Sequence, residues 1–337
     1  MKIVDFFKKL FGENDNKQLL DAPKTQYQDL VESIDDLELC KMFVERTTRN
    51  MTPVIEKAVQ PYLQYQQVGN KVYEFPMQTA ITKEDTLELA QRFFSSIDES
   101  LCEKFNNIIN ANNPNIVLEM EKDNGKGAST TNPNEIPVTV YIPIRDDIRQ
   151  LYEFVHECTH TFDIDNGDTP TRSVLGEVAP QCMERLLDDF LLEMSDEDMQ
   201  RYSFDRSTIE KDIKDRRITT FLSRFNNAQS LYRRCGDKKK DSRYMLAQIY
   251  SAHFNKFDKK QKKDKLLSFI ECVKNDEFDI ANKCFELFID KKARLNDLHR
   301  ETYVDDAISE VADLIVPKNQ EDSKIQQKEI DKNDIVR

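Results

Sequence analysis

The stretch at residues 146–160 reads Asp-Asp-Ile-Arg-Gln-Leu-Tyr-Glu-Phe-Val-His-Glu-Cys-Thr-His. Its apolar residues recur at helical spacing, as at Ile148, Leu151, Phe154 and Val155. Two aspartates precede them, which is typical of a helix N-terminus. The stretch therefore predicts a single helix with an apolar face and a second face that carries two histidines.

The end of this helix, His156-Glu157-Cys158-Thr159-His160, matches the HExxH metal-binding pattern. Residues four apart on a helix lie about 6 Å apart along the axis and on nearly the same face. His156 and His160 can therefore bind one zinc ion. Glu157 lies beside them, where it can act as general base toward a metal-activated water. The motif predicts a zinc-dependent hydrolase.

Two β-branched runs precede the helix, at 115–120 and 138–142, and a Gly-, Asn-, Ser- and Pro-rich stretch separates them. They predict two strands and a loop. With Gly and Pro scarce, at 7 and 11 residues, the rest of the chain favours helices. The predicted fold is mainly α, with a small β-sheet packed on the active-site helix. The second strand would be an edge strand that pairs with an extended peptide, with Val138 and Val140 as substrate-binding residues.

The chain divides into four predicted segments. An amphipathic segment and linker occupy 1–24, a helical region 25–112, the catalytic region with later helices 113–316, and a charged, disordered tail 317–337. Residues 1–12 allow a helix that touches a membrane or one that docks on the protein itself.

Composition restricts the partners and the compartment. The 62 acidic against 49 basic residues give a net charge of −13 without a long basic block, which argues against nucleic acid. The 7 cysteines are odd in number and form no Cys-x-x-Cys pair, as is typical of reduced thiols. The sequence shows no secretory signal or membrane span, so we expect a cytoplasmic protein, with non-classical secretion left open. Its partner would be a peptide or protein substrate.

A third metal ligand is expected on the next helix, because a catalytic zinc keeps three protein ligands and one open position. Glu177, Gln181 and Glu184 fall on one face there, beside an apolar stripe. Glu177 is the first candidate, and the aspartates within 163–168 compete with it. Glu184 fits a solvated face as well as a metal site.

The stretch 138–192 resembles the oligoendopeptidase F and thimet oligopeptidase family of helical, gluzincin zinc peptidases. The resemblance rests on Tyr-Glu-Phe-Val-His-Glu-Cys-Thr-His, ending at His160, and on Gly-Glu-Val-Ala-Pro-Gln-Cys-Met-Glu, ending at Glu184, and it covers about 115–255. It implies a zincin-like catalytic region, one zinc ion, Glu177 as third ligand and Glu184 as a supporting carboxylate that orients a ligating histidine.

The same resemblance implies a tyrosine that stabilises the oxyanion. Tyr244 and Tyr250 lie in the matching segment, although aromatic packing in the core explains them equally well. One departure concerns Thr159, where the family usually has glycine. Threonine there also occurs in aspzincins, whose third ligand is an aspartate, so the 163–168 alternative stays open.

The sequence therefore predicts a zinc metalloendopeptidase. Two alternatives remain: a non-catalytic helical interaction protein derived from a zincin, and a zinc hydrolase with a non-peptide substrate, because HExxH specifies the ion and the base but not the leaving group. The first alternative predicts no bound zinc, or zinc without an open coordination position. Substrate screening distinguishes the second alternative, a hydrolase with a non-peptide substrate, from a peptidase.

Overall fold

The computed structural model describes residues 76–125, 127–130, 137–162, 176–233, 238–274 and 297–315, together with isolated positions between 42 and 62. The predicted segments 1–24 and 317–337, and the aspartates within 163–168, lie outside the described residues. No helix in the described ranges has the length and apolar character needed to cross a bilayer.

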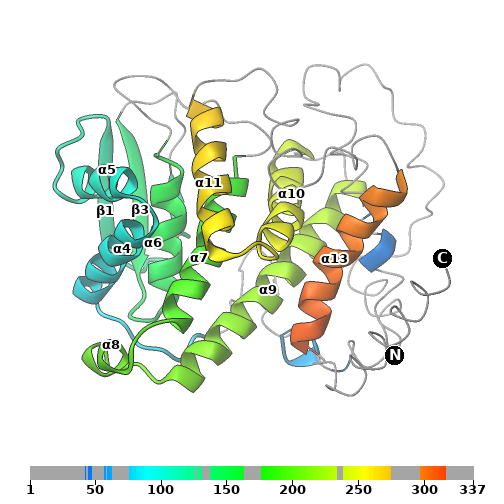
Figure 1. Ribbon diagram of the computed structural model, residues 1–337, viewed down its shortest axis with the longest axis horizontal. Coiled ribbons are helices and arrows are strands. Elements are labelled where there is room, and N and C mark those ends of the chain that lie inside the picture. The colour runs from blue at the N-terminus through cyan, green and yellow to red at the C-terminus, as the bar shows by residue number, and fades with distance from the viewer. Residues whose placement is uncertain are drawn as a thin grey trace.

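The described part is mainly helical with a small sheet, which confirms the predicted fold class. Its elements in chain order are α4 (Lys83–Ile97), α5 (Glu99–Ile109), β1 (Ile116–Lys122), β2 (Ser129–Thr130), β3 (Val138–Ile144), α6 (Arg149–Thr159), α7 (Val178–Leu192), α8 (Asp196–Arg201), α9 (Arg206–Arg233), α10 (Lys238–Phe254), α11 (Lys259–Lys274) and α13 (Asp297–Ile315). Figure 1 shows the sheet, α4, α5 and α6 together at the left of the molecule, and α9, α10 and α13 at the right. Helix α7 lies between these two groups.

The sheet has the order β1-β3-β2, with β1 parallel and β2 antiparallel to β3. β3 packs against α6, as its apolar composition predicts. The prediction that β3 is an edge strand is wrong, because the Ser129–Thr130 part of the expected loop pairs with it as β2. Val138 and Val140 are 1% and 0% exposed and belong to the core, so their side chains are not available to a substrate. The outer strand beside α6 is β2.

An aromatic cluster holds α6 against α4 and α5. The ring of Phe94 lies 5.1 Å from Phe105 and 5.0 Å from Phe162, and Phe105 lies 5.5 Å from Phe154 on α6. All four are fully buried, and such ring pairs add to the hydrophobic gain from burial. The apolar face of α6 is thereby fixed, and its histidine face is turned toward α7. The core includes residues from both sides of residue 112.

The N-terminus of α4 is stabilised by a side-chain cap. Thr82 has extended backbone angles, and its hydroxyl accepts a hydrogen bond from the Asp85 amide at 3.0 Å. We expect Thr82→Ala to lower the free energy of unfolding by about 1 kcal/mol, measured by urea denaturation. Ser95→Ala, which removes an exposed hydroxyl from the same helix, would change it by only a few tenths of that. Equal stabilities for both variants would contradict the cap.

Candidate metal centre

Two polar rows meet where α6 packs against α7. On α6 the row is Tyr152, His156 and His160, four residues apart, which places all three on one face. On α7 and its N-cap the facing row runs in the opposite direction, as Asp188, Glu184 and Glu177. Each residue of the first row contacts the second row: Tyr152 with Asp188, His156 with both Glu184 and Glu177, and His160 with Glu177. The two helices therefore bring five ionisable groups and a phenol into one buried seam.

The end of this seam at His160 and Glu177 is a potential metal site. His156 Nε2 lies 3.2 Å and His160 Nε2 3.6 Å from Glu177 Oε2, and one ligand atom from each residue lies within 4.8 Å of the others. Tetrahedral zinc with bonds of about 2.0–2.2 Å places its ligand atoms about 3.4 Å apart. These separations and donor types fit a zinc ion. Glu177 occupies the N-cap of α7 without capping it through its side chain, so its carboxylate faces the histidines.

The charges around the imidazoles also suit a cation. Burial disfavours the charged form of His156, but Glu177 and Glu184 outweigh this and raise its pKa well above the ordinary value. Burial likewise opposes the charge of Glu177, but His160 and His156 lower the pKa of this carboxyl well below its usual range. The carboxylates around His156 stabilise positive charge at its imidazole, which a metal ion supplies as readily as a proton does.

Glu184 contacts His156 on the ring nitrogen that points away from the potential metal site. Its Oε1 lies 2.6 Å from His156 Nδ1, and its Oε2 accepts a hydrogen bond from Arg216 at 2.5 Å. A carboxylate on Nδ1 fixes the proton on that nitrogen and leaves Nε2 as the ligand atom. The side chain of Glu184 is only 15% exposed, so it does not belong to a solvated face.

A buried ion cluster continues the seam beyond Glu184. Asp188 is 0% exposed and accepts hydrogen bonds from Tyr152 at 2.6 Å, Arg217 at 2.8 Å and Arg216 at 3.2 Å. The Arg216 guanidinium also lies 3.8 Å from the centre of the Tyr152 ring. Burial alone would raise the pKa of Asp188, but Arg217 and Arg216 lower it to about 2. The cluster fixes Arg216, which in turn holds Glu184.

The expected general base has a partner on the sheet. The Thr130 hydroxyl of β2 lies 2.7 Å from Glu157 Oε2 and 3.1 Å from the Glu157 carbonyl oxygen. Because Thr130 lies on the outer strand, β2 touches both α6 and the carboxylate beside the metal group. This contact restricts the orientation of Glu157.

The two tyrosines that the resemblance suggests for the oxyanion lie on α10. Tyr250 is 0% exposed and packs in the hydrophobic core, whereas Tyr244 is partly exposed. The placement of Tyr250 agrees with core packing, and an oxyanion role for either residue stays a prediction.

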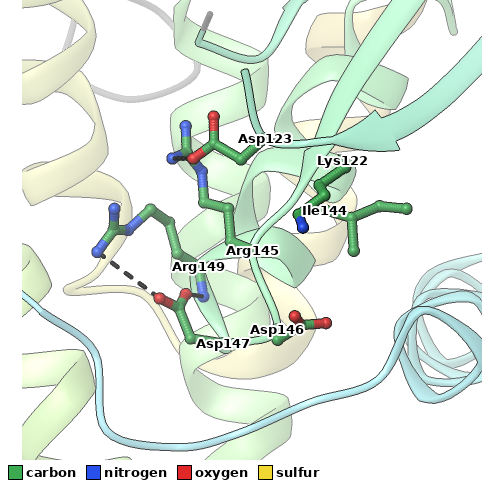
Figure 2. A pocket seen from close by; sticks show the side chains of 7 residues that line it. All are labelled: Lys122, Asp123, Ile144, Arg145, Asp146, Asp147 and Arg149. Carbon is green, nitrogen blue, oxygen red and sulfur yellow. Dashed lines mark hydrogen bonds and ion pairs between the residues drawn. The ribbon is translucent and has the colours of Figure 1, made fainter. Parts of the chain in front are cut away.

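An open surface pocket of about 550 Å³ lies at the C-terminal ends of β1 and β3. Figure 2 shows its ion pairs, in which Arg145 points toward Asp123 and Arg149 toward Asp147. Arg149 begins α6, and His156 lies seven residues later, about 10 Å along the axis. The pocket is therefore separate from the metal group.

Several residues of the site were not predicted from the sequence, among them Asp188, Thr130 and Arg216. Asp188 continues the row of Glu177 and Glu184 by one further turn, so an extension of that face would have identified it. Thr130 and Arg216 carry no comparable local signal, because their partners lie 27 and 32 residues away in the chain.

Comparison with known proteins gives a shared fold rather than a family. No protein-family model matches the chain, and no curated protein matches it either. A solved structure from Chlamydophila abortus, described as a "putative peptidase", superposes with a TM-score of 0.52 at 13% sequence identity. The match covers 84% of this chain but 56% of that protein, so the chain spans just over half the length of its structural neighbour. At this identity the likeness shows the fold, and it does not show membership of the oligoendopeptidase F and thimet oligopeptidase family.

Proposed function

We propose that this protein is a zinc-dependent metallopeptidase. The observation that carries the proposal is the convergence of His156, His160 and Glu177 within 4.8 Å, with Glu157 next to the first histidine. The fold shared with a "putative peptidase" supports the same class of substrate. His156, His160 and Glu177 would hold the metal, and Glu184 would orient His156.

The chemistry divides between the ion and the protein. Zinc, when bound, supplies a Lewis acid that polarises a carbonyl and makes water more acidic. Glu157 accepts the proton of the attacking water and then delivers it to the leaving amine. Thr130 keeps the Glu157 carboxylate in position through its hydrogen bond. An extended peptide would approach β2, the outer strand, rather than β3.

Metal content and peptide cleavage, measured together, test this function. Purified protein supplied with zinc would contain about one zinc per chain by elemental analysis. It would cleave members of a mixed quenched-fluorescent peptide library, lose this activity with a chelator and regain it with zinc. Protein that stays free of zinc would contradict the proposal. Bound zinc without cleavage would instead favour a non-peptide substrate or a binding role.

The supporting role of Glu184 gives a prediction about metal affinity. Glu184→Gln keeps the shape of the side chain but replaces the charge-assisted contact with His156 Nδ1 by a neutral one. We expect the affinity for zinc to fall about 10–100-fold, measured by competition with a chelator of known affinity.

The matched control is Glu193→Gln, which changes a carboxylate that is 55% exposed at the end of the same helix. Its zinc affinity would equal that of the wild type. Equal affinities for both variants would show that Glu184 does not orient the ligand.

A further inference from the structure

Strand β1 forms one edge of the sheet, at the left of β3 in Figure 1. In the order β1-β3-β2 it pairs with β3, and no other strand of the described chain pairs with its outer side. Strand β2, whose Thr130 contacts Glu157, lies beyond β3. The outer edge of β1 is therefore distinct from the edge that a substrate would approach.

The hydrogen bonds at the two ends of β1 show which of its backbone groups point outward. The Asn115 carbonyl accepts a hydrogen bond from β3 at 2.7 Å, and the Asp123 amide donates one to β3 at 3.3 Å. Odd-numbered residues of this stretch therefore bond to β3. Because backbone groups alternate in direction along a strand, the N–H and C=O groups of Leu118 and Met120 point away from the sheet.

This edge lacks the usual protection against pairing. Native edge strands are commonly very short, bulged or interrupted by proline. Strand β1 keeps all seven residues, Ile116–Lys122, in continuous register with β3 and contains no proline. Val117 is 39% exposed, and Leu192 is the only other large apolar side chain of the described ranges that is exposed. The edge of β1 can therefore accept a further strand.

The charges of β1 indicate what kind of strand fits. Glu119 and Glu121 are exposed and alternate with the half-buried Leu118 and Met120, so both carboxylates lie on the same face as Val117. Side chains that lie directly opposite each other in neighbouring strands interact, and opposite charges stabilise the pair. A strand with lysine or arginine at alternate positions therefore complements this face.

A second copy of the chain fits this edge less well. Each copy has a net charge of −13, so two copies repel each other. Parallel pairing of two β1 strands in register would set Glu119 against Glu119 and Glu121 against Glu121. Antiparallel pairing centred on Glu119 also sets this residue against itself, and like charges directly opposite destabilise a sheet.

We propose that the outer edge of β1 docks an extended, basic segment of a partner protein, which joins the sheet as an additional strand. The backbone groups of Leu118 and Met120 would supply the affinity. Glu119 and Glu121 would select lysine or arginine at alternate positions of the partner. The proposal is independent of peptidase activity, because this surface shares no residue with the candidate metal centre.

The probe is a synthetic peptide, Thr-Lys-Val-Lys-Val-Lys-Thr, with both ends capped. At about ten times its Kd it would slow hydrogen exchange at the outward amides of Leu118 and Met120 about tenfold. The amides of Val117 and Glu119, which bond to β3, would change little. The same peptide with glutamate in place of each lysine would not bind.

Two N-methylated forms of the peptide test the backbone pairing. A strand bonds to one neighbour with every second amide, so methyl groups on the valine amides and on the lysine amides block opposite edges of the peptide. One form would lose roughly tenfold or more in affinity, because several backbone hydrogen bonds are removed. The other form would bind as the parent peptide does.

Charge reversal on β1 tests the choice of partner. Glu119→Lys combined with Glu121→Lys would weaken binding of the lysine peptide roughly tenfold, because both cross-strand pairs become repulsive. Glu197→Lys combined with Glu210→Lys changes the net charge equally at exposed positions on α8 and α9 and would bind as the wild type does. Equal losses in the two double variants would contradict selection by the β1 glutamates.

Three further results would overturn the proposal. One is unchanged hydrogen exchange at Leu118 and Met120 in excess peptide, and another is equal binding by the two N-methylated forms. The third is a dimer of the protein alone, seen by sedimentation, that dissociates in Met120→Pro. This change removes an outward N–H and no bond to β3, so the edge would then belong to a second copy. If the β1 double variant does not fold, the N-methylated peptides decide on the wild type.

Discussion

Glu157→Gln is expected to lower peptide hydrolysis by about 10²–10⁴-fold, the usual contribution of a general base. The carboxamide has the shape of the carboxylate and can still accept a hydrogen bond from Thr130, which lies 2.7 Å away in the wild type. It cannot accept a proton from water at neutral pH. The change therefore removes the chemistry of Glu157 and leaves its surroundings in place.

Initial rates on the best peptide of the library, with zinc content measured on the same samples, check this expectation. Zinc would stay at about one ion per chain, because Glu157 is not among the three clustered ligand candidates. Glu153→Gln is the matched control, since Glu153 lies one turn before Glu157 on the same helix and is paired with Arg145 at 3.0 Å. Wild-type rates in Glu157→Gln would refute the assignment of the base.

Asp188→Asn is expected to cost the protein about 3–5 kcal/mol of stability, the typical result of breaking a buried ion pair. The Asp188 side chain is 0% exposed and satisfies Arg217, Arg216 and the Tyr152 hydroxyl at once. An asparagine has the same size but removes the charge that the two guanidinium groups share, which leaves Arg216 with Glu184 and Arg217 with Glu310. Removing the charge therefore destabilises the seam between α6, α7 and α9.

Urea denaturation of wild type and Asp188→Asn measures this loss of stability. Asp306→Asn is the control, because its carboxylate pairs with Lys256 and the two side chains are 34% and 51% exposed. Partly exposed pairs contribute little, so we expect a loss of about 1 kcal/mol or less from the control. Equal losses from the two variants would show that the buried cluster does not stabilise the fold.

The pH dependence of the difference in stability between wild type and Asp188→Asn gives an independent check. The pKa of Asp188 is about 2 in the folded protein, below the ordinary value of about 3.9. The stabilisation by its charge is therefore complete above about pH 4 and is lost as the pH falls toward 2. The gap in stability between wild type and Asp188→Asn would narrow over that range and stay constant at neutral pH.

The sequence predicted those features that depend on local spacing. His156 and His160 share a helix face because they are four residues apart, and the apolar periodicity of 148–158 determines the opposite, buried face. The β-branched runs predicted β1 and β3, because strand propensity is also a property of the local sequence. Glu177 was selected by its place before the next helix, where the structure brings it to the histidines.

The tertiary structure alone decided the pairing between elements. The order β1-β3-β2 made β3 a central strand, because Ser129 and Thr130 hold a register against Tyr141 and Val140 that composition does not reveal. The antiparallel alignment of α6 and α7 set His156 against Glu184 and Tyr152 against Asp188. Arg216 reached both carboxylates only because α9 packs on α7. Helix periodicity fixes which residues share a face, but the depth and register at which two faces meet depend on packing the whole core.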